Sequence, residues 1–182
     1  MRKYLIACAV ALAVLALDQA TKLWVVADFR PGESVDVLSV FALTYVRNQG
    51  AAWGMFQGAQ LWLAGVGVLA VILCFVFWRK IFGDHAWAAP VAGLLLGGII
   101  GNLIDRVRLG YVIDFLDFHW GASHFPCFNI ADSAICIGVF ALIVLQWVYG
   151  ESGENGERKT ERAGAKRQTF HGHGGARQAD DE

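Results

Sequence analysis

Charged residues are scarce in this chain of 182 residues. They make up 17% of it, against about 25% in a typical soluble protein. Basic and acidic residues almost cancel, with a formal net charge of −1, so the sequence lacks the basic stripe of a nucleic-acid-binding protein. The four cysteines include no CxxC pair that would suggest metal or redox chemistry. Hydrophobic residues, in contrast, reach 56%, which excludes an ordinary soluble enzyme and indicates a protein embedded in lipid.

Four apolar segments are long enough to cross a bilayer, which takes about 20 residues. They cover residues 4–27, 61–78, 86–104 and 130–149. The sequence therefore predicts a mainly α-helical membrane domain over residues 1–150, with four transmembrane helices. Residues 151–182 are densely charged and are predicted to form a disordered cytoplasmic tail.

The positions of Lys and Arg predict the orientation of these segments. Ten of these residues lie before the first segment, between the second and third, or in the tail, and four lie in the other two connections. Cytoplasmic loops carry the excess of positive charge. Both termini are therefore predicted to be cytoplasmic, with connections 28–60 and 105–129 on the outside.

The two outer connections are more than linkers. Ser34–Val46 is rich in β-branched and aromatic residues with partial alternation, which predicts a strand in a small β-rich segment, residues 28–60, that rests on the membrane. Residues 110–128 contain glycine, proline and several aromatic residues. They are predicted to form a short outer loop or helix between the third and fourth helices.

Ionisable and amide side chains within apolar segments are costly and therefore face a partner or a watery cavity. In this chain they all lie at or near the outer ends of the segments. They are Asp18, Lys22, Asn102, Asp105, Arg106, Asn129 and Asp132, with Asp114 just beyond the third segment. This clustering indicates a polar site close to the outer membrane surface.

Some of these residues need no chemical role, because a structural role accounts for their presence. Asp18 and Lys22 are four residues apart, so they share a helix face, and a structural ion pair is the favoured interpretation. Asn102 and Asn129 can hold helices together through hydrogen bonds. His119, like the nearby His124, has no nucleophile near it in the sequence and is expected at the surface or an interface.

Asp114 and Asp132 favour a chemical role. Asp114 has an apolar setting, and Asp132 lies at a helix start, where the helix dipole favours its ionised form. If the fold brings them together, like charge and low dielectric prevent both from ionising. One carboxylate can then activate water while one carboxylic acid polarises a carbonyl. Two aspartates could equally form a cation site.

Several short segments, in this order and at this spacing, resemble the lipoprotein signal peptidases, also called signal peptidase II. The matching segments are Asp18–Lys22 (DQATK), Arg47–Gly54 (RNQGAAWG), Gly98–Arg106 (GIIGNLIDR), Val112–Phe115 (VIDF) and Phe128–Ser133 (FNIADS). The resemblance covers residues 4–149 and excludes the tail.

The resemblance implies an intramembrane aspartyl endopeptidase of the bacterial inner membrane that needs no metal and no organic cofactor. Its substrates would be prolipoproteins that carry diacylglyceryl-cysteine, cut on the amino side of that cysteine. The catalytic residues would be Asp114 and Asp132, at the outer leaflet. Membrane lipids would be its other partners, it would act as a monomer, and the antibiotic globomycin would inhibit it.

The remaining motif residues would support this centre. Three asparagines would orient the carboxylates or hold the substrate backbone, Arg106 would contact a substrate carbonyl or a lipid head group while paired with Asp105, and the Asp18–Lys22 pair would support the helices. The supporting set is Asn48, Asn102, Asn129, Asp105, Arg106, Asp18 and Lys22.

Two other classes of protein fit parts of the pattern. A small transporter or ion-conducting protein would use the intramembrane carboxylates as a polar path, but it needs polar groups through the whole depth of the membrane. A non-enzymatic membrane subunit would use the charges only for helix association, and it leaves Asp114, outside any segment, without a role.

Overall fold

The computed structural model describes residues 1–50, 55–56, 58–83 and 85–148. The helices in these ranges are α1 (Arg2–Asp28), α2 (Gln60–Val76), α3 (Trp78–Phe82), α4 (Ala88–Leu109) and a C-terminal helix, Ile130–Val148. The tail after residue 150 and motif residues 51–54 lie outside the described residues. Met1–Leu142 form one compact unit, and the arrangement described below is that of this unit.

Each of the four predicted apolar segments is helical. Among the described residues, three helices are long and apolar enough to cross a membrane: α1, α4 and Ile130–Val148. The fourth, α2, has 17 residues and ends at Val76, and the short helix α3 follows it. Helix α4 continues five residues beyond the predicted end at 104, so Asp105 and Arg106 lie on the helix itself.

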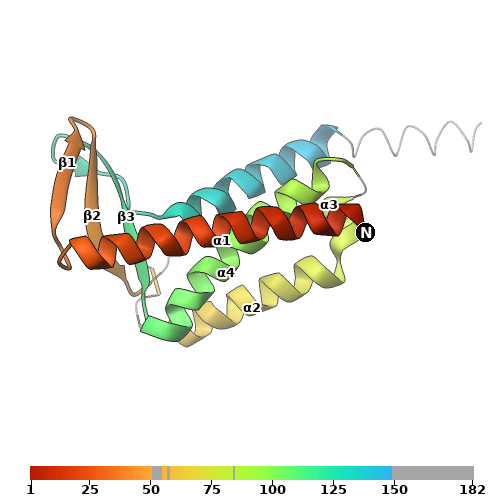
Figure 1. Cartoon of the computed structure of the whole chain (residues 1–182), viewed down its shortest axis with the longest axis horizontal. Coiled ribbons are helices and arrows are strands. Elements are labelled where there is room, and N and C mark those ends of the chain that lie inside the picture. Colours follow the sequence, from red (N-terminus) through yellow and green to blue (C-terminus); the bar gives the residue numbers. More distant parts are fainter. Residues whose placement is uncertain (51–54, 57, 84, 149–182) are drawn as a thin grey trace, which may run out of the picture. The chain divides into compact units, whose positions relative to one another are not determined.

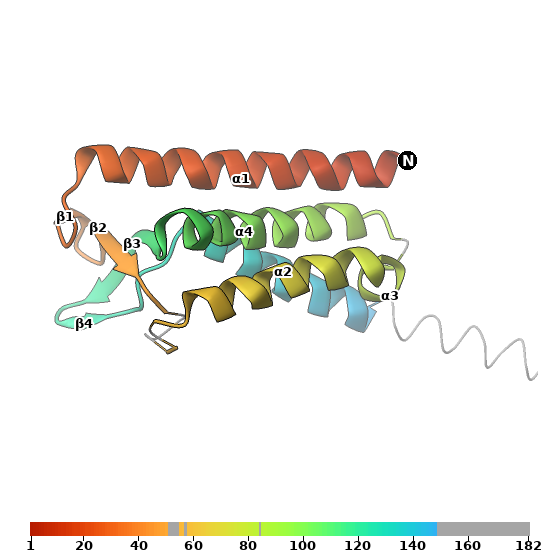
Figure 2. The ribbon, with the colours of Figure 1, turned by 90° about the horizontal axis from the view of Figure 1, so that it is seen from below.

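Helix α4 is the central helix of this unit. In α4, 67% of an 18-residue apolar stretch is buried, compared with 11% of the corresponding stretch in α1. α1 packs along α4 on one side and α2 packs on another (Figures 1 and 2). Glycines on α4 allow the close approach: a Cβ added at Gly97 would lie 2.8 Å from the Ala11 carbonyl oxygen. Small residues at such interfaces are typical of packed membrane helices.

A four-stranded antiparallel sheet lies beyond one end of the helices (Figures 1 and 2). Its strands, in spatial and chain order, are β1 (Ser34–Leu38), β2 (Phe41–Asn48), β3 (Val112–Trp120) and β4 (Ser123–His124). The predicted strand Ser34–Val46 is therefore a hairpin of two strands. The prediction of a loop or helix for residues 110–128 is wrong, because β3 pairs along β2, with Asn48 opposite Val112.

The sheet is anchored to the helices by a small apolar core. Ile113 and Phe115 of β3 pack with Tyr45 of β2 and Val25 of α1. Successive side chains of a strand point to opposite faces. Asp114, between Ile113 and Phe115, therefore points to the face opposite this core.

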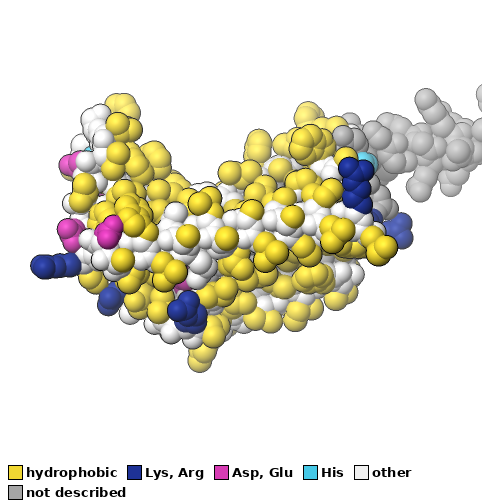
Figure 3. All heavy atoms as spheres, viewed as in Figure 1, with side chains coloured by type: hydrophobic (Ala, Val, Ile, Leu, Met, Phe, Trp, Pro, Cys, Tyr) yellow, Lys and Arg dark blue, Asp and Glu magenta, His cyan; other side chains and the backbone are white. Residues whose placement is uncertain are grey.

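Apolar side chains cover the sides of the helices, as Figure 3 shows for one face of the molecule. In that view the carboxylates gather near the sheet, and lysines and arginines lie both there and at the opposite ends of the helices. Exposed large side chains on α1 include Leu5, Leu12 and Leu23, with 63–70% of their surface exposed. Such a surface is stable in lipid and costly in water.

Candidate active site

Asp114 is buried in β3, with 1% of its surface exposed, and both of its carboxyl oxygens accept a hydrogen bond. Asn48 Nδ2, from the end of β2, donates to Oδ2 at 2.8 Å. Asn129 Nδ2 donates to Oδ1 at 2.7 Å. The β2–β3 pairing places Asn48 beside Asp114, two residues along the register, so the two strands together build half of the site.

Asp132 lies in the first turn of the C-terminal helix, and Asn129 caps that helix. The backbone N–H of Asp132 donates to Asn129 Oδ1 at 2.9 Å, and the backbone N–H of Asn129 donates to Asp132 Oδ2 at 3.3 Å. This reciprocal arrangement is a capping box, which fixes the start of a helix. Because Asn129 bonds to both aspartates, it ties the strand carboxyl to the helix carboxyl.

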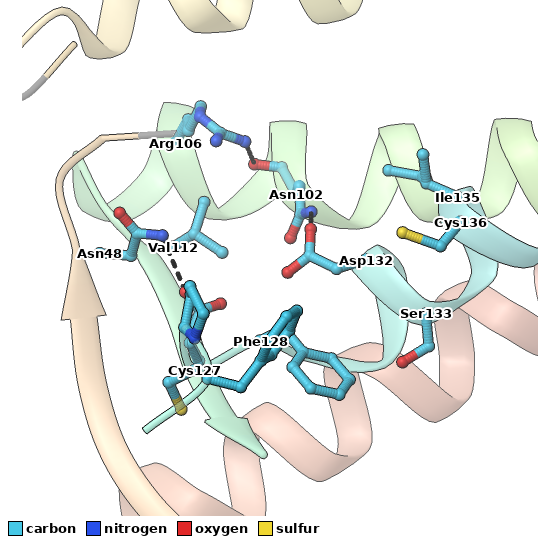
Figure 4. Close-up of a pocket in the computed structure, with 13 residues that line it drawn as sticks. Asn48, Asn102, Arg106, Val112, Cys127, Phe128, Asp132, Ser133, Ile135 and Cys136 are labelled. Atoms are coloured by element: carbon cyan, nitrogen blue, oxygen red, sulfur yellow. Dashed lines mark hydrogen bonds between the residues drawn. The ribbon is translucent and has the colours of Figure 1, made fainter. Parts of the chain in front are cut away.

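Asn102 holds the second carboxyl from α4. Its Nδ2 donates to Asp132 Oδ1 at 2.7 Å (Figure 4). Its Oδ1 accepts from Lys22 Nζ at 3.0 Å and from Asn129 Nδ2 at 3.1 Å. An amide oxygen that accepts two hydrogen bonds requires the NH₂ group to point the other way. These contacts fix the orientation of the Asn102 amide toward Asp132.

Lys22 sits behind Asn102 in a fully buried ionic cluster. Its Nζ lies 2.9 Å from Asp18 Oδ2, as the four-residue spacing predicts, and 2.8 Å from Asp105 Oδ2. All three side chains have at most 3% of their surface exposed. The same carboxylates also accept from the backbone N–H groups of Ala131 and Ile113. The cluster therefore joins α1 and α4 to the start of the C-terminal helix and of β3.

Gln19 is a further member of the cluster that the sequence reasoning missed. Its Nε2 lies 3.1 Å from Asp18 Oδ2 and 3.2 Å from Asp105 Oδ1. The signal was its place inside the DQATK motif, directly next to Asp18. Gly101 completes this packing, because a Cβ there would lie 2.6 Å from Asp18 Oδ2.

Asp114 and Asp132 both line one pocket of about 400 Å³. Figure 4 shows Asp132 and other residues of this pocket. Asn48, Asn102 and Arg106 line it on the polar side. Its apolar side consists of Val112, Phe125, Pro126, Cys127, Phe128, Ile135 and Cys136, with Ser133 beside Asp132. A cavity of this size with a few convergent polar groups is typical of a binding or catalytic site.

Arg106 lines the pocket and is not paired with Asp105. Its Nη1 donates to the Asn102 carbonyl oxygen at 3.2 Å and its Nη2 to the Gly50 carbonyl oxygen at 3.4 Å. The predicted pairing with Asp105 is wrong because adjacent residues on a helix point in different directions. Within the described part of the chain, Arg106 Nε has no hydrogen-bond partner.

Cys127 lines the pocket, but its chemistry does not fit a nucleophile. Burial raises the pKa of the Cys127 thiol well above its ordinary value, with nearby Asp114 and Asp117 adding to the shift. A thiol is nucleophilic only as the thiolate. Cys127 therefore stays a neutral pocket-lining side chain, and in the described residues no group of three or more His, Cys, Asp or Glu side chains is arranged to hold a metal ion.

Burial raises the pKa of Asp114 to about 7, and the charge of Asp132 adds to this shift. The hydrogen bonds from Asn48 and Asn129 act in the opposite direction because they stabilise the carboxylate. At neutral pH the Asp114 carboxyl therefore still holds a proton in a large fraction of molecules. This is the ionisation that a pair of carboxyls needs for combined acid and base catalysis.

The raised pKa predicts a pH dependence for any hydrolysis at this pocket. One carboxyl must be protonated and the other ionised, so the active form is lost when the last proton leaves the pair. We expect kcat/KM to fall as pH rises through about 7, the pKa of Asp114. A profile from pH 5 to 9 on a purified preparation measures this, and a rate that stays level or increases above pH 7 would contradict it.

Known proteins are similar to this chain over most of its length. A family model described as Signal peptidase (SPase) II matches residues 10–148. The lipoprotein signal peptidase of Shewanella loihica is 43% identical over 152 residues, which cover 81% of this chain and 89% of that protein. The one from Syntrophotalea carbinolica is 43% identical over 143 residues, covering 76% and 88%.

A solved structure, described as a bacterial membrane enzyme, matches the fold with a TM-score of 0.72. It is 33% identical in sequence, and the match covers 81% of this chain and 90% of that one. Residues 10–148, the part of this chain that matches the family model, include every residue that lines the pocket. The chain belongs to the signal peptidase II family.

Proposed function

We propose that Asp114 and Asp132 are the catalytic pair of this aspartic protease, which cleaves the signal peptides of lipoprotein precursors. The observation that carries the proposal is the shared pocket, in which Asn129 donates to both carboxyls, through its side chain to Asp114 and through its backbone N–H to Asp132. The raised pKa of Asp114 supports it, because one carboxyl of such a pair must keep a proton. The pair titrates as a unit, so one carboxyl acts as the base while the other acts as the acid.

In the proposed reaction, one carboxylate removes a proton from a water molecule, and the resulting hydroxide attacks the scissile carbonyl carbon. The other carboxyl donates its proton to the carbonyl oxygen as the tetrahedral intermediate forms. Collapse of the intermediate breaks the carbon–nitrogen bond, and a proton passes to the leaving amine. No metal ion and no organic cofactor takes part in this scheme.

The polar residues around the pair have distinct supporting roles in the proposal. Asn48, Asn102 and Asn129 aim the carboxyls at the pocket. The Arg106 guanidinium lines the pocket, so it is placed to donate to a substrate carbonyl or a lipid head group. Asp18, Lys22 and Asp105 act behind this layer by holding Asn102, rather than by touching the substrate.

The substrate we propose is a prolipoprotein that carries diacylglyceryl-cysteine, cut on the amino side of that cysteine. The apolar side of the pocket supports this, because Phe125, Phe128 and Ile135 suit an apolar chain. The acyl chains would stay in lipid while the scissile peptide bond reaches the polar side.

We further propose four membrane crossings. α1 and α4 both run toward the sheet, so the chain has to return between them, and α2 with α3 is the segment that does so (Figures 1 and 2). The 17 residues of α2 span about 26 Å, close to the hydrocarbon thickness of about 30 Å.

The charge distribution supports an orientation with the active site at the outer leaflet of the bacterial inner membrane. Arg2, Lys3, Arg79 and Lys80 lie at the helix ends away from the sheet, where the positive-inside rule places the cytoplasm. Both termini are then cytoplasmic. Residues 1–150 form the peptidase domain, and it acts as a monomer with membrane lipids around it.

The function is tested with purified protein and a synthetic precursor peptide that carries diacylglyceryl-cysteine. We expect cleavage directly before the modified cysteine, identified by mass spectrometry, and inhibition by globomycin. The matched control is the same peptide without the lipid, which should be cleaved at least about tenfold more slowly if the acyl chains bind the protein. Equal cleavage of both peptides would contradict the proposed substrate class.

The alternative of a transporter or ion channel finds little support. The buried charges Asp18, Lys22 and Asp105 neutralise one another in one cluster near the sheet. In α1, residues 4–17 carry no charge, and neither do residues 88–101 of α4. A polar path needs groups at successive depths, which these helices do not provide.

A further inference from the structure

A second polar cluster lies on the sheet, apart from the proposed catalytic pair. At its centre is Asp117 of β3, which is 7% exposed. Thr44 Oγ1 of β2 donates to its Oδ2 at 2.9 Å, and His124 Nδ1 of β4 lies 2.8 Å from its Oδ1. A buried carboxylate is costly unless such bonds compensate for lost hydration. The proposed reaction uses none of these residues, so the cluster needs a different explanation.

The contact between His124 and Asp117 holds a very short strand. β4 has two residues, and its register with β3 consists of two residue pairs. One further backbone bond, from the Phe125 N–H to the Phe118 carbonyl oxygen at 2.8 Å, continues this pairing. With so few backbone bonds, the side-chain contact contributes a large share of what fixes β4 on the sheet.

The four residues that follow β4, Phe125–Phe128, all line the active-site pocket. We call this segment the pocket wall. Its far end is fixed by Phe128, whose backbone bonds to Leu116 at 2.8 and 3.2 Å and whose ring stacks on Phe118 at 5.9 Å. Its near end depends on the position of His124. The wall is thus held at its far end by the pairing of Phe128, and at its near end by the few backbone bonds of β4 and Phe125 together with the contact between His124 and Asp117.

We propose that His124 and Asp117 are positioning residues that hold the pocket wall where it contacts the apolar part of the substrate. This inference rests on the proposed function of the pocket. The catalytic carboxyls have separate supports, Asn48, Asn102 and Asn129, none of which belongs to the cluster. Loosening the wall therefore weakens substrate binding and leaves the chemical step largely unchanged.

The test measures kcat and KM separately on the lipidated peptide, with the full-length protein. We expect His124→Ala to raise KM about three- to tenfold, the range for one lost hydrogen bond, with kcat within about twofold of wild type. His124→Asn should restore KM, because Asn Nδ2 occupies the position of His Nδ1 along the side chain. Thr44→Val, which removes the other partner of Asp117, should raise KM in the same direction.

Asp36→Asn is the matched control. Asp36 is a carboxylate of the same sheet with 83% of its side chain exposed, and it lies 3.8 Å from His119. It should leave both constants unchanged. A wild-type KM in His124→Ala, a fall in kcat alone, or no restoration by His124→Asn would each overturn the wall proposal. Asp114→Asn is assayed alongside, because its activity reports on the proposed function itself and so separates the two failures.

Discussion

Asp114→Asn and Asp132→Asn should each reduce cleavage of a lipidated precursor by about a thousandfold or more, the upper part of the range for loss of a general acid or base. Each change removes a carboxyl that must exchange a proton with water or with the scissile amide. Each carboxyl accepts hydrogen bonds at both oxygens, whereas an amide has one acceptor oxygen, so each variant loses one of these bonds in addition to the proton transfer. Rates are measured by mass spectrometry on purified protein.

Folding has to be followed in the same preparations, because both side chains are hydrogen-bonded inside the pocket. The melting temperature in detergent serves for this, and Asp36→Asn serves as a control for removing one negative charge from the outer part of the protein. A folded variant of either residue with wild-type activity would refute the assignment of the pair. Loss of activity in only one of them would assign the chemistry to a single carboxyl.

Lys22→Met should destabilise the protein by about 3–5 kcal/mol, the cost of removing one partner from a buried ion pair. Methionine fills a similar volume, so the effect comes from the two carboxylates of Asp18 and Asp105, which lose the cation between them. For a chain of this size the loss corresponds to a melting temperature lower by roughly 6–20 °C.

The matched control is the combined variant Lys22→Met with Asp18→Asn and Asp105→Asn. It carries no uncompensated charge in the cluster, so we expect it to regain part of the lost melting temperature. An unchanged melting temperature in Lys22→Met would show that water or another cation reaches the cluster.

Local patterns in the sequence predicted the helices and the charged pair on α1. Long apolar runs gave four helical segments to within a few residues, because helix formation in lipid depends mainly on local composition. The spacing of Asp18 and Lys22 predicted their contact, which is confirmed at 2.9 Å. The motifs also selected Asp114 and Asp132, although their common pocket became visible only in the structure.

The sequence analysis did not predict the features that depend on pairing between segments far apart in the chain. β3 has buried residues on both faces, from Val112 to Phe115, so its sequence lacks the alternation that signals a strand. Its partner β2 lies more than 60 residues earlier. His124 is exposed, as expected, but its contact with Asp117, a residue the sequence analysis did not consider, was not predicted. Their contact exists only because β4 folds back on β3.

Residues 4–17 of α1 and residues 88–101 of α4 carry no charge. In the proposed orientation these residues lie between the proposed catalytic pair and the cytoplasm, and they contain no Asp, Glu, Lys, Arg or His that could relay a proton. We therefore expect protons taken up and released during turnover to exchange with the outer side, so that no charge crosses the membrane electric field. Cleavage is then driven by amide hydrolysis itself, and its rate should be independent of the membrane potential, unlike that of a proton-coupled transporter.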